Sequence, residues 1–157
     1  KGGFCILMED AKDILDTKSK EGEFTIKKDT LAKEINYAER ERQEISNTLS
    51  GNMIKVKVEN THPLMFRLPS QIYFLNQSSS LYHVDKSWNP LLKTELKPKY
   101  LGFLGSNMAK LLPSTSFFAV KEKGKGKFVW FGFNPLFRAI PSEASTIIDN
   151  CLLYSTY

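Results

Sequence analysis

The chain has 157 residues, of which 41% are hydrophobic and 25% are charged, a composition typical of one globular domain with a buried core. Its Lys and Arg residues outnumber Asp and Glu by 22 to 17, for a formal charge of +5. Basic residues are spread along the chain and alternate with acidic ones over residues 18–23, whereas nucleic-acid surfaces cluster them with exposed aromatics. We therefore expect no nucleic-acid partner, and no apolar run has the length of a membrane span.

The first 50 residues predict two strands and a charged helix. Residues 4–8 form an uninterrupted apolar run, which is typical of a strand covered on both faces, as in parallel sheets. A short helical stripe at residues 11–15 and a short strand at 24–26 follow. Asp29 or Thr30 can cap a helix that runs to about residue 47, and its charged middle predicts a solvated face.

The middle of the chain predicts strands separated by polar turns. Residues 53–58 alternate apolar side chains with Lys, which indicates a strand with one face in water. Pro63 ends it, because proline holds the preceding His62 extended and cannot donate to a ladder. Two further strands, at residues 72–75 and 81–84, flank a Gln-Ser-Ser-Ser turn, and a polar connection rich in Lys and Pro occupies residues 85–99.

The last third predicts a strand at residues 100–104, a short helix at 108–112, two strands joined by a glycine turn, and a final helix at 143–154. The turn contains Gly124-x-Gly126 and leads into a strand. A phosphate-binding loop leads instead into a helix N-terminus, so we interpret this turn as a hairpin. Together these elements predict an α/β layered domain with a mixed sheet.

The loop after the last strand is the strongest candidate for a binding site. Ligands of open α/β sheets bind at the carboxyl ends of strands, and Asn134 and Arg138 follow such a strand. Asn134-Pro135 predicts a turn, and Arg138 has the geometry to clamp a carboxylate or phosphate. The alternative is that Arg138 anchors the loop through backbone carbonyls.

The histidines of this chain do not have the ligand spacing that zinc-dependent hydrolases use. Met65 and Lys86 lie three residues after His62 and His83, so neither histidine begins an HxxE or HExxH pattern. Glu59 and His62 would share a metal only if the strand end curled, and a third ligand is missing. We interpret His62 as a turn residue bonded to local backbone, and as a weaker ligand-binding candidate.

Cysteine catalysis has one weak candidate, Cys5. Both Cys5 and Cys151 lie in apolar runs, which predicts buried thiols. Cys5 lies inside a strand and not at a G-x-C-x-G strand-to-helix elbow. A catalytic role would require His62 or His83 to fold against it.

Three segments carry a family resemblance. They are residues 37–46 (Tyr-Ala-Glu-Arg-Glu-Arg to Ile-Ser), residues 58–64 (Val-Glu-Asn-Thr-His-Pro-Leu), and the Gly-Lys-Gly-Lys of residues 124–127 running on to Asn-Pro-Leu-Phe-Arg at 134–138. In this order they resemble the C-terminal region of bacterial M14-type zinc carboxypeptidase-like proteins, of the sort common in Bacteroidetes. In those proteins the region resembles a class I glutamine amidotransferase-like domain that follows the peptidase domain.

The resemblance implies a flavodoxin-like three-layer α/β/α domain that lacks the Cys-His-Glu triad. Residues 1–157 would be one such domain, incomplete at its N-terminal side and a fragment of a longer chain. Its partner would be the upstream carboxypeptidase-like domain of the same polypeptide, which would hold the zinc, in a secreted or periplasmic protein. No cofactor and no catalytic residue carry over to this chain. The sequence departs from the family by having Phe133 before the Asn-Pro-Leu-Phe-Arg string and residues 139–142 (Ala-Ile-Pro-Ser) after it.

The leading hypothesis is therefore a non-catalytic accessory domain that stabilises the peptidase domain or helps to present its substrate. One alternative is a degenerate amidotransferase-like hydrolase that uses Cys5. Another is a carbohydrate- or peptide-binding module that uses the loop from Asn134 to Arg138. Self-association through an exposed sheet edge is a further expectation, because missing upstream strands would leave that edge unpaired.

Overall fold

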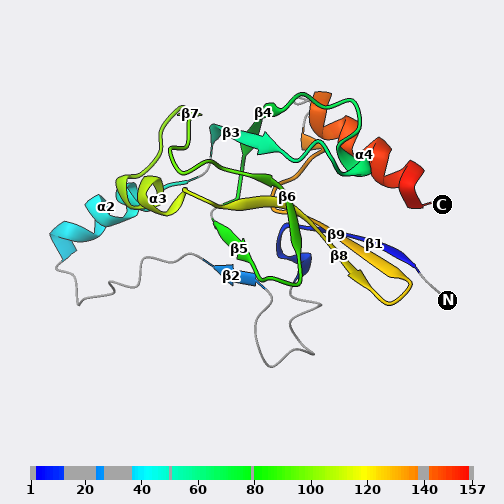
Figure 1. Ribbon diagram of the computed structural model, residues 1–157. Coiled ribbons are helices and arrows are strands. Elements are labelled where there is room, and N and C mark those ends of the chain that lie inside the picture. Colours follow the sequence, from blue (N-terminus) through cyan, green and yellow to red (C-terminus); the bar gives the residue numbers. More distant parts are fainter. Residues whose placement is uncertain are drawn as a thin grey trace.

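The computed structural model describes residues 3–12, 24–26, 37–49, 51–78, 80–137 and 142–155. Within them the chain forms a mixed, curled sheet with a few helices (Figure 1), so the expected α/β class is confirmed. The strands are β1 (Phe4–Met8), β2 (Phe24–Ile26), β3 (Asn52–Val58), β4 (Gln71–Asn76), β5 (Tyr82–Val84), β6 (Asn89–Lys93), β7 (Tyr100–Leu101), β8 (Ser116–Lys123) and β9 (Gly126–Phe131). The helices are α2 (Tyr37–Ser46), α3 (Ser106–Leu111) and α4 (Ser142–Ser155), with short 3-10 helices η1 (Glu9–Lys12) and η2 (Pro63–Met65).

The main path of the sheet runs β1-β9-β8-β6-β3-β4. β1 and β9 pair in parallel, with Phe4 opposite Lys127, and the other strand pairs of the described residues are antiparallel. β8 and β9 form the predicted hairpin. Gly124 has a φ of 62° at the first central position of this two-residue turn, which is the conformation a type II′ hairpin requires.

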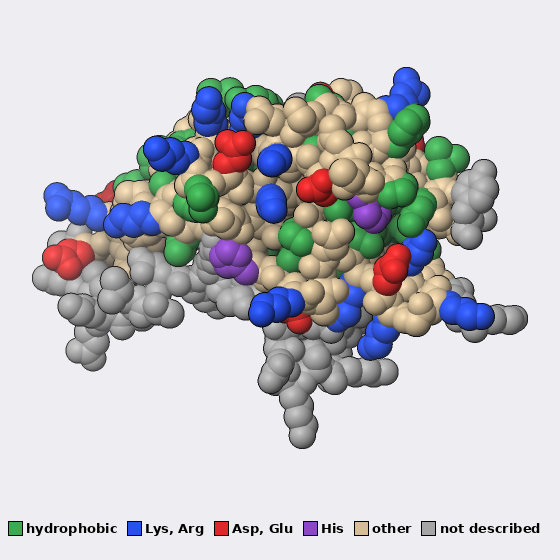
Figure 2. Space-filling view, in the orientation of Figure 1, with side chains coloured by type: hydrophobic (Ala, Val, Ile, Leu, Met, Phe, Trp, Pro, Cys, Tyr) green, Lys and Arg blue, Asp and Glu red, His purple; other side chains and the backbone are tan. Residues whose placement is uncertain are grey.

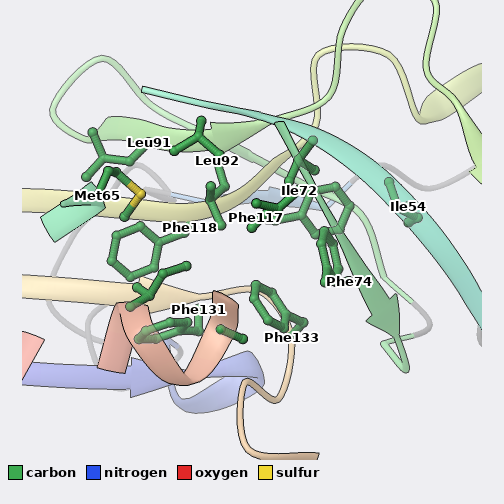
Figure 3. Close-up of a cluster of buried hydrophobic side chains, with 14 of the residues drawn as sticks. Ile54, Met65, Ile72, Phe74, Leu91, Leu92, Phe117, Phe118, Phe131 and Phe133 are labelled. Carbon is green, nitrogen blue, oxygen red and sulfur yellow. The ribbon is translucent and has the colours of Figure 1, made fainter. Parts of the chain in front are cut away.

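β8 and β9 are covered on both faces, as their apolar runs predict, whereas β1 lies at the end of the path and its residues are mostly half-buried. On one face Phe118 and Phe131 belong to the main core, which Figure 3 shows as a cluster of converging phenylalanine and aliphatic side chains beside a helix. α4 contributes to this core through Ala144, Ile147 and Cys151. Because strand side chains alternate between faces, intervening residues such as Trp130 point to the opposite side.

Trp130 anchors a smaller cluster on that opposite face, with Leu7, Tyr82, Trp88 and Ala119. The rings of Tyr82 and Trp130 meet edge to face at 5.2 Å between centroids. In the described residues the cover of this face therefore comes from β5 and from the turn before β6. Aromatic burial of this size contributes strongly to stability.

Several elements differ from the sequence predictions. The connection at residues 85–99 contains β6, whose Leu91 and Leu92 are fully buried between β8 and β3. Two apolar residues among Lys and Pro are too few to show a strand period. β4 and β5 form as predicted, but β4 pairs with β3, and β5 pairs with β2 and β8.

The remaining predicted elements are confirmed with altered ends. The strand expected at residues 100–104 spans only Tyr100–Leu101, and the short helix begins at Ser106. Of the short helical stripe expected at residues 11–15, the structure describes residues 11 and 12, which belong to the 3-10 helix η1. The capping residues Asp29 and Thr30 lie outside the described residues.

Candidate functional site

The turn from β1 into the short 3-10 helix η1, called the elbow below, contains a left-handed residue. Glu9, the first residue of η1, has a φ of 47°, a left-handed conformation that is uncommon for residues other than glycine. The Trp130 indole Nε1–H donates to the backbone carbonyl of Glu9 at 3.0 Å and ties the turn to β9. A strained turn between a strand and a helix is where hydrolases of several folds hold an exposed nucleophile.

The structure does not bring Cys5 to this elbow. Cys5 lies four residues before Glu9 and is opposite Phe128 in the parallel β1–β9 ladder. The expectation that Cys5 is buried is confirmed only in part, since its side chain is half-buried against the Trp130 cluster. Its position inside a strand leaves the elbow itself with a carboxylate, Glu9, which the sequence predictions missed.

His62 is used as a helix cap. Its backbone is extended, at φ −89° and ψ 135°, and its Nδ1 accepts a hydrogen bond from the backbone N–H of Leu64 at 3.2 Å. This confirms the prediction of a turn residue bonded to local backbone. Burial lowers the pKa of His62, which Glu122 partly offsets and Lys127 reinforces, so the imidazole is neutral near pH 7 and suited to accept this bond.

Asn134 also bonds within its own loop. Its Oδ1 accepts from the backbone N–H of Leu136 at 3.0 Å, and the N–H of Phe137 donates to the Asn134 carbonyl at 3.4 Å. Such a side-chain turn explains the residue without a ligand. Arg138 lies outside the described residues, so the carboxylate clamp remains a prediction.

The second thiol, Cys151, is fully buried on the inner face of α4. Burial raises its pKa to about 12, so the thiol stays protonated and unreactive at neutral pH. This confirms the prediction of a buried thiol. In the part of the chain that the structure describes, no group of three or more His, Cys, Asp and Glu side chains is placed to hold a metal ion.

A hollow that the sequence predictions missed lies where η2 meets the last turns of α4. It has a volume of about 250 Å³ and is lined by Pro63, Phe66, Asn150, Leu153 and Tyr154. The sequence marks one wall of the hollow, the apolar Leu-Leu-Tyr run at residues 152–154 at the end of the last helix, but not the contact with η2 that forms it. The hollow is an open feature of the surface and not an enclosed cavity.

Comparisons with family models, with curated proteins and with solved structures find no match to this chain. The family resemblance therefore rests on the three sequence motifs alone. No helix in the described ranges is long and apolar enough to span a bilayer. On the face that Figure 2 shows, Lys and Arg side chains are scattered among acidic and apolar ones.

Proposed function

We propose that this chain is a non-catalytic accessory domain of a larger zinc carboxypeptidase-like protein, in which it follows the peptidase domain. The resemblance of three sequence motifs to M14-type carboxypeptidase-like proteins supports this assignment. The mixed sheet with a parallel β1–β9 pair is compatible with a flavodoxin-like, class I glutamine amidotransferase-like domain. In this proposal the domain stabilises the peptidase or helps to present its substrate, the zinc belongs to the peptidase, and the whole protein is periplasmic or secreted.

The main support for a non-catalytic role is the residue at the elbow after β1, which is Glu9 and not a cysteine. A cysteine hydrolase needs an accessible thiolate close to a helix N-terminus or to a base that lowers its pKa. Here the left-handed residue is Glu9, and Cys5 is held within β1, opposite Phe128. The described residues therefore place no thiol at this turn.

Other polar candidates have local structural roles that support the same conclusion. The His62 Nδ1 is occupied by the Leu64 N–H, so it is not available to accept a proton from a thiol. Asn134 closes its own turn. A buried or capped polar group of this kind stabilises the fold by satisfying backbone donors.

Two measurements test the proposal. An antibody to this chain should detect a native polypeptide several times heavier than 17.9 kDa in the source cells. The isolated chain should hydrolyse neither glutamine nor a small amide. A native mass near that of this chain would overturn the accessory role. Turnover by the isolated chain that is lost in Cys5→Ser would overturn the non-catalytic assignment.

A further inference from the structure

We infer that the hollow between η2 and α4 is the docking face for the domain that precedes β1 in the same polypeptide. That domain would insert one apolar side chain, flanked by carboxylates, between Phe66 and Leu153. This inference rests on the proposed function and names the contact by which an accessory domain would hold its neighbour. Five features of the described residues lead to it.

The first feature is an exposed apolar rim. The side chains of Phe66 and Leu153 are 66% and 65% exposed, and the adjacent Leu152 is 56% exposed. Single exposed apolar residues are ordinary on protein surfaces, but Phe66 and Leu153 line the same hollow together with Tyr154. An aromatic and aliphatic pocket of this kind is typical of the central anchor of a protein interface.

The size of the hollow favours a protein partner over a small ligand. Sites for small molecules and cofactors usually have volumes of roughly 300–1,000 Å³ and enclose most of the ligand. The hollow has about 250 Å³ and is open to solvent. It therefore fits a single anchoring side chain whose remaining surface is covered by the protein that carries it.

The walls of the hollow are already fixed. The Asn150 Nδ2 donates to the backbone carbonyls of Leu64 at 3.0 Å and Phe66 at 2.9 Å, which fastens the η2 loop to α4. The ammonium group of Lys127 lies 3.9 Å from the centroid of the Tyr154 ring and restrains that wall. A preorganised pocket loses little conformational freedom on binding, so more of the contact energy appears as affinity.

The path of the chain places the preceding domain beside this face. Phe4, at the start of β1, meets Tyr154 edge to face at 6.4 Å between ring centroids. The start of β1 and the end of α4 lie on the same side of the molecule (Figure 1). A domain that precedes β1 would therefore be connected to the sheet close to the hollow. With a short linker, this covalent connection gives the domain an effective concentration in the millimolar range at the hollow.

The charged residues around the hollow favour a partner surface that carries carboxylates. Arg67 is exposed and adjacent to Phe66, and Lys127 lies over Tyr154. Lys125 is exposed in the turn that leads to Lys127. Two exposed carboxylates oppose these three cations, Glu122 opposite Lys127 in the β8–β9 ladder and Asp149 next to Asn150. This excess of positive charge favours a partner with carboxylates around its apolar anchor, because complementary charge fixes orientation and excludes wrong partners.

Hydrogen exchange tests the docking face directly. Amide exchange is measured by mass spectrometry in the native full-length polypeptide and in this chain alone. We expect exchange at residues 64–68 and 151–154 to be slowed about tenfold or more in the full-length polypeptide. Residues 101–103 contain the exposed Leu101 and Phe103 and should exchange equally in both.

A matched pair of variants adds a second readout. Phe66→Ser and Phe103→Ser both remove an exposed phenyl group, from side chains that are 66% and 59% exposed. In the full-length polypeptide we expect Phe66→Ser alone to restore fast exchange at residues 151–154, with the melting temperature of the isolated domain unchanged. An effect of equal size from Phe103→Ser would overturn the inference.

The outcomes separate this inference from the proposed function. A native polypeptide no longer than this chain refutes the accessory role itself. A longer polypeptide with equal exchange at residues 64–68 refutes only the docking face. Protection in the isolated chain that grows with protein concentration also refutes it, because a second copy of the chain would then be the occupant.

Discussion

The strained turn at Glu9 predicts that a glycine there stabilises the protein. Glu9 has a φ of 47°, and a left-handed conformation costs an L-residue about 1–2 kcal/mol. Glycine avoids that cost but loses about 0.5–1 kcal/mol more backbone freedom on folding. The difference predicts that Glu9→Gly raises the free energy of unfolding by about 0.5–1 kcal/mol. The Trp130 hydrogen bond is kept, because its acceptor is the Glu9 backbone carbonyl.

Urea and thermal unfolding of the isolated chain measure this gain. For a domain of this size 1 kcal/mol shifts the melting temperature by about 2–4 °C, so the increase should be about 1–4 °C. Glu9→Ala is the matched control, because it removes the same carboxylate but keeps the Cβ atom. We expect Glu9→Ala to stay within about 0.5 kcal/mol of the unsubstituted chain.

Two outcomes would refute the reasoning. If Glu9→Gly lowers the stability as much as Glu9→Ala or more, the turn is not left-handed and the comparison with a nucleophile elbow fails. If both variants raise it equally, the carboxylate itself is the cause, through repulsion or desolvation. Only a gain specific to glycine supports a turn that is strained in its backbone.

Three further predictions concern a glycine between two helices, the buried thiol and the capping histidine. Gly105→Ala should lower the free energy of unfolding by about 2–3 kcal/mol in urea titrations, because the new Cβ atom would overlap the Ser46 carbonyl; an unchanged midpoint would contradict the α2–α3 contact. Cys151 should resist iodoacetamide at pH 8 until the chain unfolds, since a pKa of about 12 leaves about one thiolate in 10⁴; labelling in the folded state would contradict it. The pKa of His62 is lowered on folding, so the free energy of unfolding should fall as the pH drops from about 6.5 through the lower pKa of the folded state. His62→Asn should flatten this pH dependence while keeping a side-chain cap for the Leu64 N–H. A pH dependence that is the same in His62→Asn would contradict the role of His62.

Elements with a strong local pattern were predictable from the sequence. Alternation in β3 and continuous apolar runs in β1 and β9 identify these strands, because burial on one face or both follows from the period. The hairpin at Gly124 follows from turn chemistry. β6 escaped prediction, because its buried pair, Leu91 and Leu92, is recognised only once β8 and β3 enclose it.

Some features of the candidate site were also predictable from the sequence, and others were not. The capping role of His62 was predictable, because Pro63 fixes the conformation of the residue before it. The hollow was not, because it forms where segments 84 residues apart meet, as in the bond from Asn150 to Phe66. The elbow was also missed, because a left-handed φ at Glu9 leaves no trace in its residue type, unlike the glycine of a hairpin.

The parallel pairing of β1 with β9 has a consequence for synthesis. β1 leaves the ribosome first among the strands, but its ladder partner ends at Phe131, so the pair cannot close until about 120 more residues have been made. At about 5–20 residues per second, that interval lasts roughly 6–25 s. During this time the apolar residues Phe4–Met8 have no ladder partner and are exposed, which favours aggregation and binding by chaperones. Loss of the last 30 residues would leave β1 permanently without its partner, so a late frameshift should yield an insoluble polypeptide and not a shortened functional domain.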